Sequence, residues 1–188
     1  MKKQILIIAA LLSVAVTTFA QITLPEQPKR AKHIDYSLRE SGYWIAVQLS
    51  PAFATTGKEQ ALALQCDIID GYRFSEFLKV GIGISPRLYT NTSPSFCGKN
   101  GRPFSLPIYA DVRGNFTPQA DAMFAICWSA DIGYAINEGF YASPFIGIRT
   151  GGIRHNFIAG LSYSFQSHSV NDSNNPIHLV GLRIGYEF

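Results

Sequence analysis

The last eight residues of the chain, GLRIGYEF at positions 181–188, alternate between two kinds of side chain. Every second residue is apolar: Leu182, Ile184, Tyr186 and Phe188. The residues between them include one positive and one negative charge, on Arg183 and Glu187. Such alternation is typical of a β-strand with an apolar face and a polar face. Soluble sheets also alternate, but they seldom end at an aromatic residue. The rest of the sequence has to show whether the apolar face packs against a protein core or against lipid.

The same alternation recurs along the chain from Gly42 onward. The predicted strands cover residues 43–53, 61–74, 78–89, 106–116, 123–136, 140–150, 155–166 and 177–188. Each is longer than the about five or six residues usual for soluble sheets. The sequence therefore predicts an all-β fold, an eight-stranded antiparallel up-and-down β-barrel that spans a membrane.

The polar faces of these strands carry charged residues. They are Asp67, Lys79, Arg87, Asp111, Arg113, Asp131, Arg149, Arg183 and Glu187. In a soluble sandwich or a lipocalin this face would meet water, whereas in a membrane barrel it lines the lumen and the apolar face meets lipid. An eight-stranded barrel is just wide enough to be filled by its own side chains, and unpaired buried charges are costly. We therefore expect an ion-pair network in the lumen; the alternative is a narrow ion path or a small-ligand site.

The connections between strands suggest an orientation. Turns after residues 74, 116 and 150 are predicted to be short, whereas residues 90–105 and 166–176 form long polar connections. Outer-membrane barrels have short periplasmic turns and longer outer loops. Both termini are therefore expected in the periplasm. Aromatic residues of the apolar faces fall mostly toward the two rims, as expected at membrane interfaces.

The N-terminal residues are expected to lie outside the barrel. Lys2 and Lys3, the apolar run at residues 5–16 and the small residues around Ala20 indicate a signal peptide over residues 1–20, cleaved before Gln21. A membrane anchor is the alternative, but the run is shorter than the ~20 residues that a spanning helix requires. Residues 21–41 are predicted to be an extended periplasmic tail, and residues 42–188 to be the barrel.

Composition excludes several classes of protein. Removal of Lys2 and Lys3 from the 16 basic residues leaves 14 against 13 acidic ones, which is no electrostatic footprint for nucleic acid. The three cysteines, Cys66, Cys97 and Cys127, are an odd number and do not suggest a disulfide framework. No metal-ligand spacing, phosphate-binding loop or nucleotide motif is present, so no cofactor is expected.

Three stretches and the eight alternating strands resemble a known family. The stretches are VGIGISPRLY at 80–89, PFIGIRTG at 144–151 and GLRIGYEF at 181–188. Residues 42–188 resemble the outer-membrane protein β-barrel domain family, the OmpA/OmpX-like eight-stranded barrels. The resemblance implies the outer membrane of a Gram-negative bacterium, with its lipids and lipopolysaccharide as neighbours. It also implies insertion by the barrel-assembly machinery, for which Tyr186 and Phe188 would form the assembly signal.

The expected function is that of a small, porin-like-family barrel with a closed, side-chain-filled lumen. It would act as an envelope structural or interaction protein through its outer loops. One alternative is an accessory subunit of a larger secretion or uptake complex. Another is a lipid A-modifying enzyme, suggested by outer-loop residues: His168, His178, Ser167, Ser169 and Ser173. Because nothing in the sequence fixes a Ser–His–acid geometry, we expect no catalysis.

Overall fold

The computed structural model describes residues 41–188, apart from 58, 92, 94, 95, 98–101, 120–122, 137, 138, 153, 168, 171, 172 and 175. The expected signal peptide and all of the expected tail except Ser41 lie outside the described residues.

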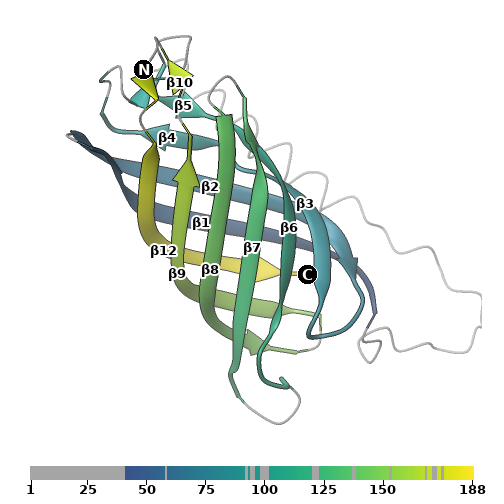
Figure 1. Cartoon of the computed structure of the whole chain (residues 1–188). Coiled ribbons are helices and arrows are strands. Elements are labelled where there is room, and N and C mark those ends of the chain that lie inside the picture. Colours follow the sequence, from purple (N-terminus) through teal and green to yellow (C-terminus); the bar gives the residue numbers. More distant parts are fainter. Residues whose placement is uncertain are drawn as a thin grey trace, which may run out of the picture. The chain divides into compact units, whose positions relative to one another are not determined.

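The described residues form strands separated by turns and loops (Figure 1). The strands are β1 (Gly42–Thr56), β2 (Glu59–Arg73), β3 (Lys79–Ile84), β4 (Arg87–Tyr89), β5 (Phe104–Ser105), β6 (Pro107–Asn115), β7 (Ala125–Ala135), β8 (Gly139–Gly151), β9 (Asn156–Gln166), β10 (Ser169–Val170), β11 (Ser173–Asn174) and β12 (Ile177–Glu187). Within this part of the chain, no helix has the length and apolar character to cross a membrane.

The sheet closes on itself because β1 pairs with both β2 and β12, in each case antiparallel. Going round the barrel, β12 pairs with β9, β9 with β8, β8 with β7, β7 with β6, β6 with β3, and β3 with β2. β3 and β4 together make one barrel strand, and so do β5 and β6. The predicted fold, a closed eight-stranded antiparallel barrel, is confirmed, with boundaries a few residues from those expected.

The interruption between β3 and β4 falls at Ser85 and Pro86, where the sequence predicted an unbroken strand. Proline has no backbone N–H to donate to a neighbouring strand. The Pro86 carbonyl still accepts a hydrogen bond from Cys66 N at 3.0 Å, and Ser85 N donates to the Pro107 carbonyl at 3.0 Å. The break therefore leaves the barrel wall continuous.

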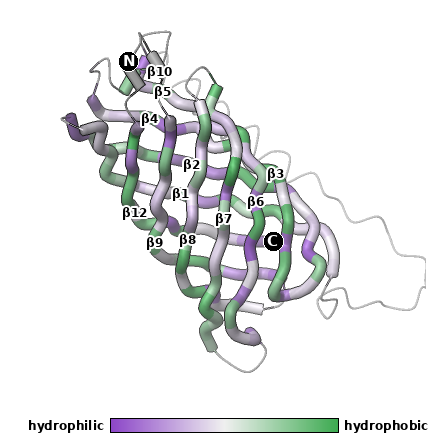
Figure 2. Tube along the Cα trace, in the orientation of Figure 1, coloured by the Kyte–Doolittle hydropathy of each residue, from purple (hydrophilic) through white to green (hydrophobic). Residues whose placement is uncertain are grey.

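The two faces of the wall differ in polarity. Hydropathy alternates from residue to residue along the strands (Figure 2). The exposed outer face carries large apolar side chains from every barrel strand, whereas nearly all charged strand residues are buried. Asp70 is the one charged residue of the described strands that is exposed on this outer face. The assignment of faces from the sequence thus agrees with the structure.

The strand ends and the termini divide the barrel into two ends. One end carries Gly42, Phe188 and the connections 74–78, 116–124 and 152–155. The other, which we call the loop end, carries the connections 57–58, 90–103, 136–138 and 167–176. Connection 116–124 is longer than the turn predicted there. It is fastened to its neighbours, because Gln119 N donates to Glu76 Oε2 at 3.0 Å and Gln119 Nε2 donates to the Gly151 carbonyl at 3.0 Å.

Candidate functional site: the charged lumen

All nine charged residues singled out in the sequence are buried inside the barrel, each at most 2% exposed. They project inward because they occupy alternate positions of β2, β3, β4, β6, β7, β8 and β12. Most of them gather in two groups along the barrel.

The first group, which we call the Glu187 cluster, lies toward the end of the barrel that carries the C-terminus. Glu187 accepts hydrogen bonds from Lys79 Nζ at 2.6 Å, Arg149 Nη2 at 2.9 Å and Arg113 Nη1 at 3.0 Å. Arg113 also holds Asp111 in a bidentate pair at 2.7 and 2.8 Å. Three cations therefore share the Glu187 carboxylate, and the Arg113 guanidinium links it to Asp111.

Two uncharged residues complete the Glu187 cluster. Arg149 Nη1 donates a hydrogen bond to Asn115 Oδ1. The ring of Trp44 lies beneath two of the cations, with Arg113 Cζ 4.8 Å and Lys79 Nζ 5.6 Å from its centroid. Cation–π contacts of this kind strengthen when the groups are removed from water.

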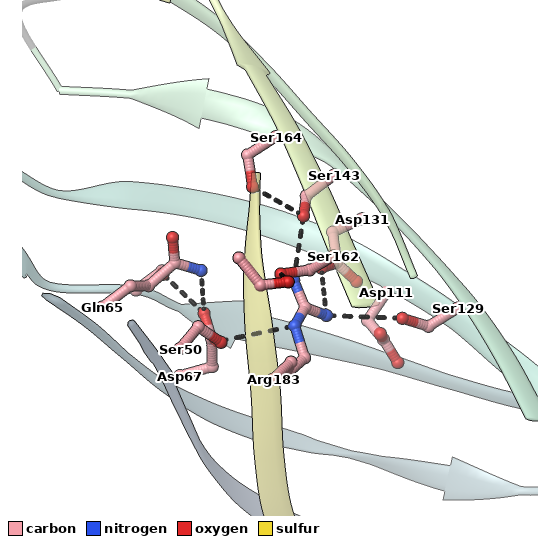
Figure 3. Close-up of polar contacts among 12 residues, drawn as sticks. Ser50, Gln65, Asp67, Asp111, Ser129, Asp131, Ser143, Ser162, Ser164 and Arg183 are labelled. Carbon is pink, nitrogen blue, oxygen red and sulfur yellow. Dashed lines mark hydrogen bonds and ion pairs between the residues drawn. The ribbon is translucent and has the colours of Figure 1, made fainter. Parts of the chain in front are cut away.

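The second group, which we call the Arg183 cluster, centres on the Arg183 guanidinium. This group lies between the carboxylates of Asp131 on β7 and Asp67 on β2 (Figure 3). Arg183 Nη1 donates to Asp131 Oδ2 at 2.9 Å, and Nη2 donates to Ser143 Oγ at 2.8 Å. Arg183 Nε lies 4.0 Å from Asp67 Oδ2. The fork geometry of arginine suits such a site, because its several donors point in fixed directions.

Asp67 is satisfied mainly by neutral donors. Its carboxylate accepts hydrogen bonds from Ser85 Oγ at 2.5 Å, Gln65 Nε2 at 2.7 Å, Tyr109 Oη at 3.2 Å and Ser50 Oγ at 3.4 Å. A buried carboxylate with this many donors does not need a close cation.

Arg87 departs from the expected ion pairing, since neutral side chains hold it. Its Nε and Nη2 donate to Gln65 Oε1 at 2.9 and 2.5 Å, and its Nη1 donates to Gln166 Oε1 at 2.9 Å. The side-chain amide of Gln65 thus bridges Arg87 and Asp67, since its oxygen accepts from Arg87 and its nitrogen donates to Asp67. The Arg87 guanidinium also lies 5.4 Å from the centroid of the Tyr141 ring.

An apolar cluster, which we call the apolar plug, lies inside the barrel at the loop end. It consists of Ala54, Ala61, Ala63, Tyr89, Phe96, Ile177 and Leu179. Phe96 comes from connection 90–103 and is fully buried, with its ring centroid 5.4 Å from that of Tyr89. Sequence reasoning missed this plug, because Phe96 lies outside the alternating segments.

Of the residues considered for catalysis, the two whose side chains the structure describes, Ser167 and His178, bond to other groups rather than to each other. His178 Nδ1 lies 2.6 Å from the Tyr163 hydroxyl, and Ser167 Oγ accepts a hydrogen bond from Phe140 N at 2.7 Å. His168 and the side chains of Ser169 and Ser173 lie outside what the structure describes. Among the described residues, no group of His, Cys, Asp and Glu could hold a metal ion.

The C-terminal aromatic pair lies on the outer face. The Tyr186 and Phe188 rings meet edge to face with centroids 4.8 Å apart, and His155 lies 6.3 and 6.4 Å from them. Phe188 N donates to the Ile45 carbonyl at 2.8 Å, which extends the β1–β12 pairing to the last residue. The contact with His155 was not foreseen, although His155 directly precedes β9, the neighbour of β12.

Comparison with known proteins supports the fold. The crystal structure of Neisserial surface protein A (NspA) matches with a TM-score of 0.60 and 12% identity, over 80% of this chain and 100% of that one. The N-terminal β-barrel domain of Pseudomonas aeruginosa OprF matches with a TM-score of 0.43 and 14% identity, over 76% of this chain and 97% of that one. No family model matches the sequence, and no curated protein matches it. The likeness to NspA establishes the barrel fold; function has to be inferred from this chain's own residues.

Proposed function

We propose that the protein is a small outer-membrane β-barrel of a Gram-negative bacterium with a closed lumen. In this role it acts as an envelope structural or interaction protein and meets its partners through the loop end. It requires neither catalysis nor transport through the barrel.

The outer surface supports insertion in a membrane. Large apolar side chains are widely exposed on it, including Phe53 at 73%, Ile82 at 68% and Leu161 at 60%. A soluble monomer rarely exposes contiguous apolar patches of more than a few hundred Å². Barrel closure also satisfies the backbone polar groups, as a lipid environment demands.

The observation that carries the proposal is the filled lumen. The Glu187 and Arg183 clusters occupy the interior, and the apolar plug covers it at the loop end. In the part of the chain that the structure describes, such an interior leaves no wide aqueous path. The parts left to contact other molecules are the outer wall and the connections at the ends.

The orientation proposed from the sequence follows the general pattern of outer-membrane barrels. Connections 90–103 and 167–176 would then face outward, where lipopolysaccharide or a partner protein can reach them. The termini and connections 74–78, 116–124 and 152–155 would lie in the periplasm.

The test is crosslinking of a tagged full-length protein in native outer membranes, followed by affinity purification. One variant replaces residues 168–175 by a short Gly-Ser linker, and a control variant replaces residues 118–122 in the same way. We expect the wild type to fractionate with the outer membrane, and its crosslinks to disappear in the first variant only.

Two results would contradict the proposal. One is a wild-type protein found outside the outer-membrane fraction. The other is an unchanged set of crosslinks after replacement of residues 168–175. A change in lipid A mass on deletion of the protein would support the enzyme alternative instead.

A further inference from the structure

A small hollow opens at the barrel end that carries the C-terminus. Its lining includes Trp44, Arg73, Lys79, Arg154 and Glu187, and it has room for roughly one water-sized sphere. The apolar plug covers the lumen at the opposite, loop end. An occupant of the hollow would therefore enter from the end of the barrel at which the chain terminates.

Some buried donors around this end have no acceptor among the described residues. Trp44 Nε1, Asn115 Nδ2 and Arg149 Nε have no hydrogen-bond partner among the described residues, and these three residues are at most 4% exposed. All three atoms are N–H donors. Because a buried donor without a partner is costly, this region favours an occupant that accepts hydrogen bonds.

The described charges of the region favour an anionic occupant. Among the described residues, its positively charged side chains are Arg73, Lys79, Arg113, Arg149 and Arg154, and its negatively charged ones are Glu76, Asp111 and Glu187. Lys79, which lines the hollow, shares Glu187 with Arg113 and Arg149. An anion in the hollow would lie beside these cations and accept a hydrogen bond from the Trp44 N–H, the unpartnered donor whose residue lines the hollow.

We propose that this hollow binds a monatomic anion, a halide such as chloride, beside the Trp44 indole and the Lys79 ammonium. The Trp44 N–H and the Lys79 ammonium supply hydrogen bonds and charge, and Arg73 and Arg154 line the mouth. The size of the hollow favours a halide over phosphate or sulfate. The site is independent of the partner proposed for the loop end.

The chain carries a reporter for this site. It has two tryptophans: Trp44 in the lumen, and Trp128, which is half-buried on the outer wall against Phe116. In a Trp128→Phe background, Trp44 is the remaining tryptophan, and iodide quenches indole fluorescence on contact. Because Trp44 is 3% exposed, quenching by random collision should be weak. We expect saturable quenching by iodide in the millimolar range, reversed by chloride at constant ionic strength.

A charge-matched pair of variants tests the location of the site. Lys79→Gln should weaken iodide binding at least about tenfold. Arg102→Gln, which removes the same charge from an exposed residue of connection 90–103, should leave binding unchanged. Quenching that rises linearly with iodide, or that responds equally to both substitutions, would overturn the proposal.

The unmodified protein gives a second measurement, in case Lys79→Gln prevents folding. Crystals of the wild type grown with bromide should show an anomalous peak beside Trp44 and Lys79. A water molecule at this position, with no anomalous signal at high bromide concentration, would overturn the proposal. Bromide that appears there at high concentration, but without saturable iodide quenching in solution, would mark an adventitious ion only and equally overturn it.

Discussion

Glu187 carries more of the lumen's electrostatic pairing than any other carboxylate in the described residues. Lys79, Arg113 and Arg149 all bond to it within 3.0 Å, and it is 1% exposed. Removing one partner of a buried pair leaves uncompensated charge in a medium that solvates it poorly. Replacement of this carboxylate by a neutral amide should therefore lower the free energy of unfolding.

We predict that Glu187→Gln lowers the free energy of unfolding by at least about 3 kcal/mol, the usual cost of breaking a buried ion pair. Unfolding by denaturant in detergent, followed by tryptophan fluorescence, measures this difference. Asp70→Asn is the matched control, since the same chemical change is made on the exposed outer face, and it should cost less than about 1 kcal/mol. Equal costs for the two variants would show that the lumen pairing contributes little to stability.

At the scale of elements, much of the architecture could be predicted from the period-two pattern. In β8, for example, Arg149 was assigned to the polar face, and the structure buries it in the lumen. The break at Pro86 was missed because the hydropathy pattern runs through it. The partners of each lumen charge could not be predicted, because they depend on register across the whole barrel, as in the contact of β12 Glu187 with β3 Lys79.

Connection 90–103 behaves as a structural element because it contributes Phe96 to the apolar plug. We predict that Phe96→Ala lowers the free energy of unfolding by about 3–5 kcal/mol, as expected for truncation of a buried phenylalanine. Phe104→Ala is the control, because this ring is 43% exposed in the neighbouring β5. The same denaturant titration measures both variants, and a loss as large for Phe104→Ala would argue against a stabilising plug.

The end of β12 is the element proposed as the assembly signal. We predict that deletion of Phe188, or serine at both Tyr186 and Phe188, lowers the amount of protein in the outer membrane far more than Arg183→Lys does. Lysine keeps the charge of Arg183 but loses part of its bonding to Asp131 and Ser143. Quantitative blotting of outer-membrane fractions at matched expression measures these amounts. Equal amounts of truncated and intact protein would show that the end of β12 is not the assembly signal.

At the scale of the whole molecule, closure should make the barrel resistant to detergent. β1 pairs with both β2 and β12, so the described sheet has no open edge at which unfolding could begin. We predict that unheated samples migrate differently from boiled samples on a detergent gel. Identical migration before and after boiling would contradict a closed barrel.

The filled lumen is the central claim, and electrical recording tests it most directly. The two ion-pair clusters and the apolar plug together occupy the barrel's interior. Folded, heat-modifiable protein inserted in a planar lipid bilayer should therefore show no stable opening of porin size. Stable openings as large as those of porins, whose wider barrels leave an aqueous channel, would contradict the closed lumen and the function proposed from it.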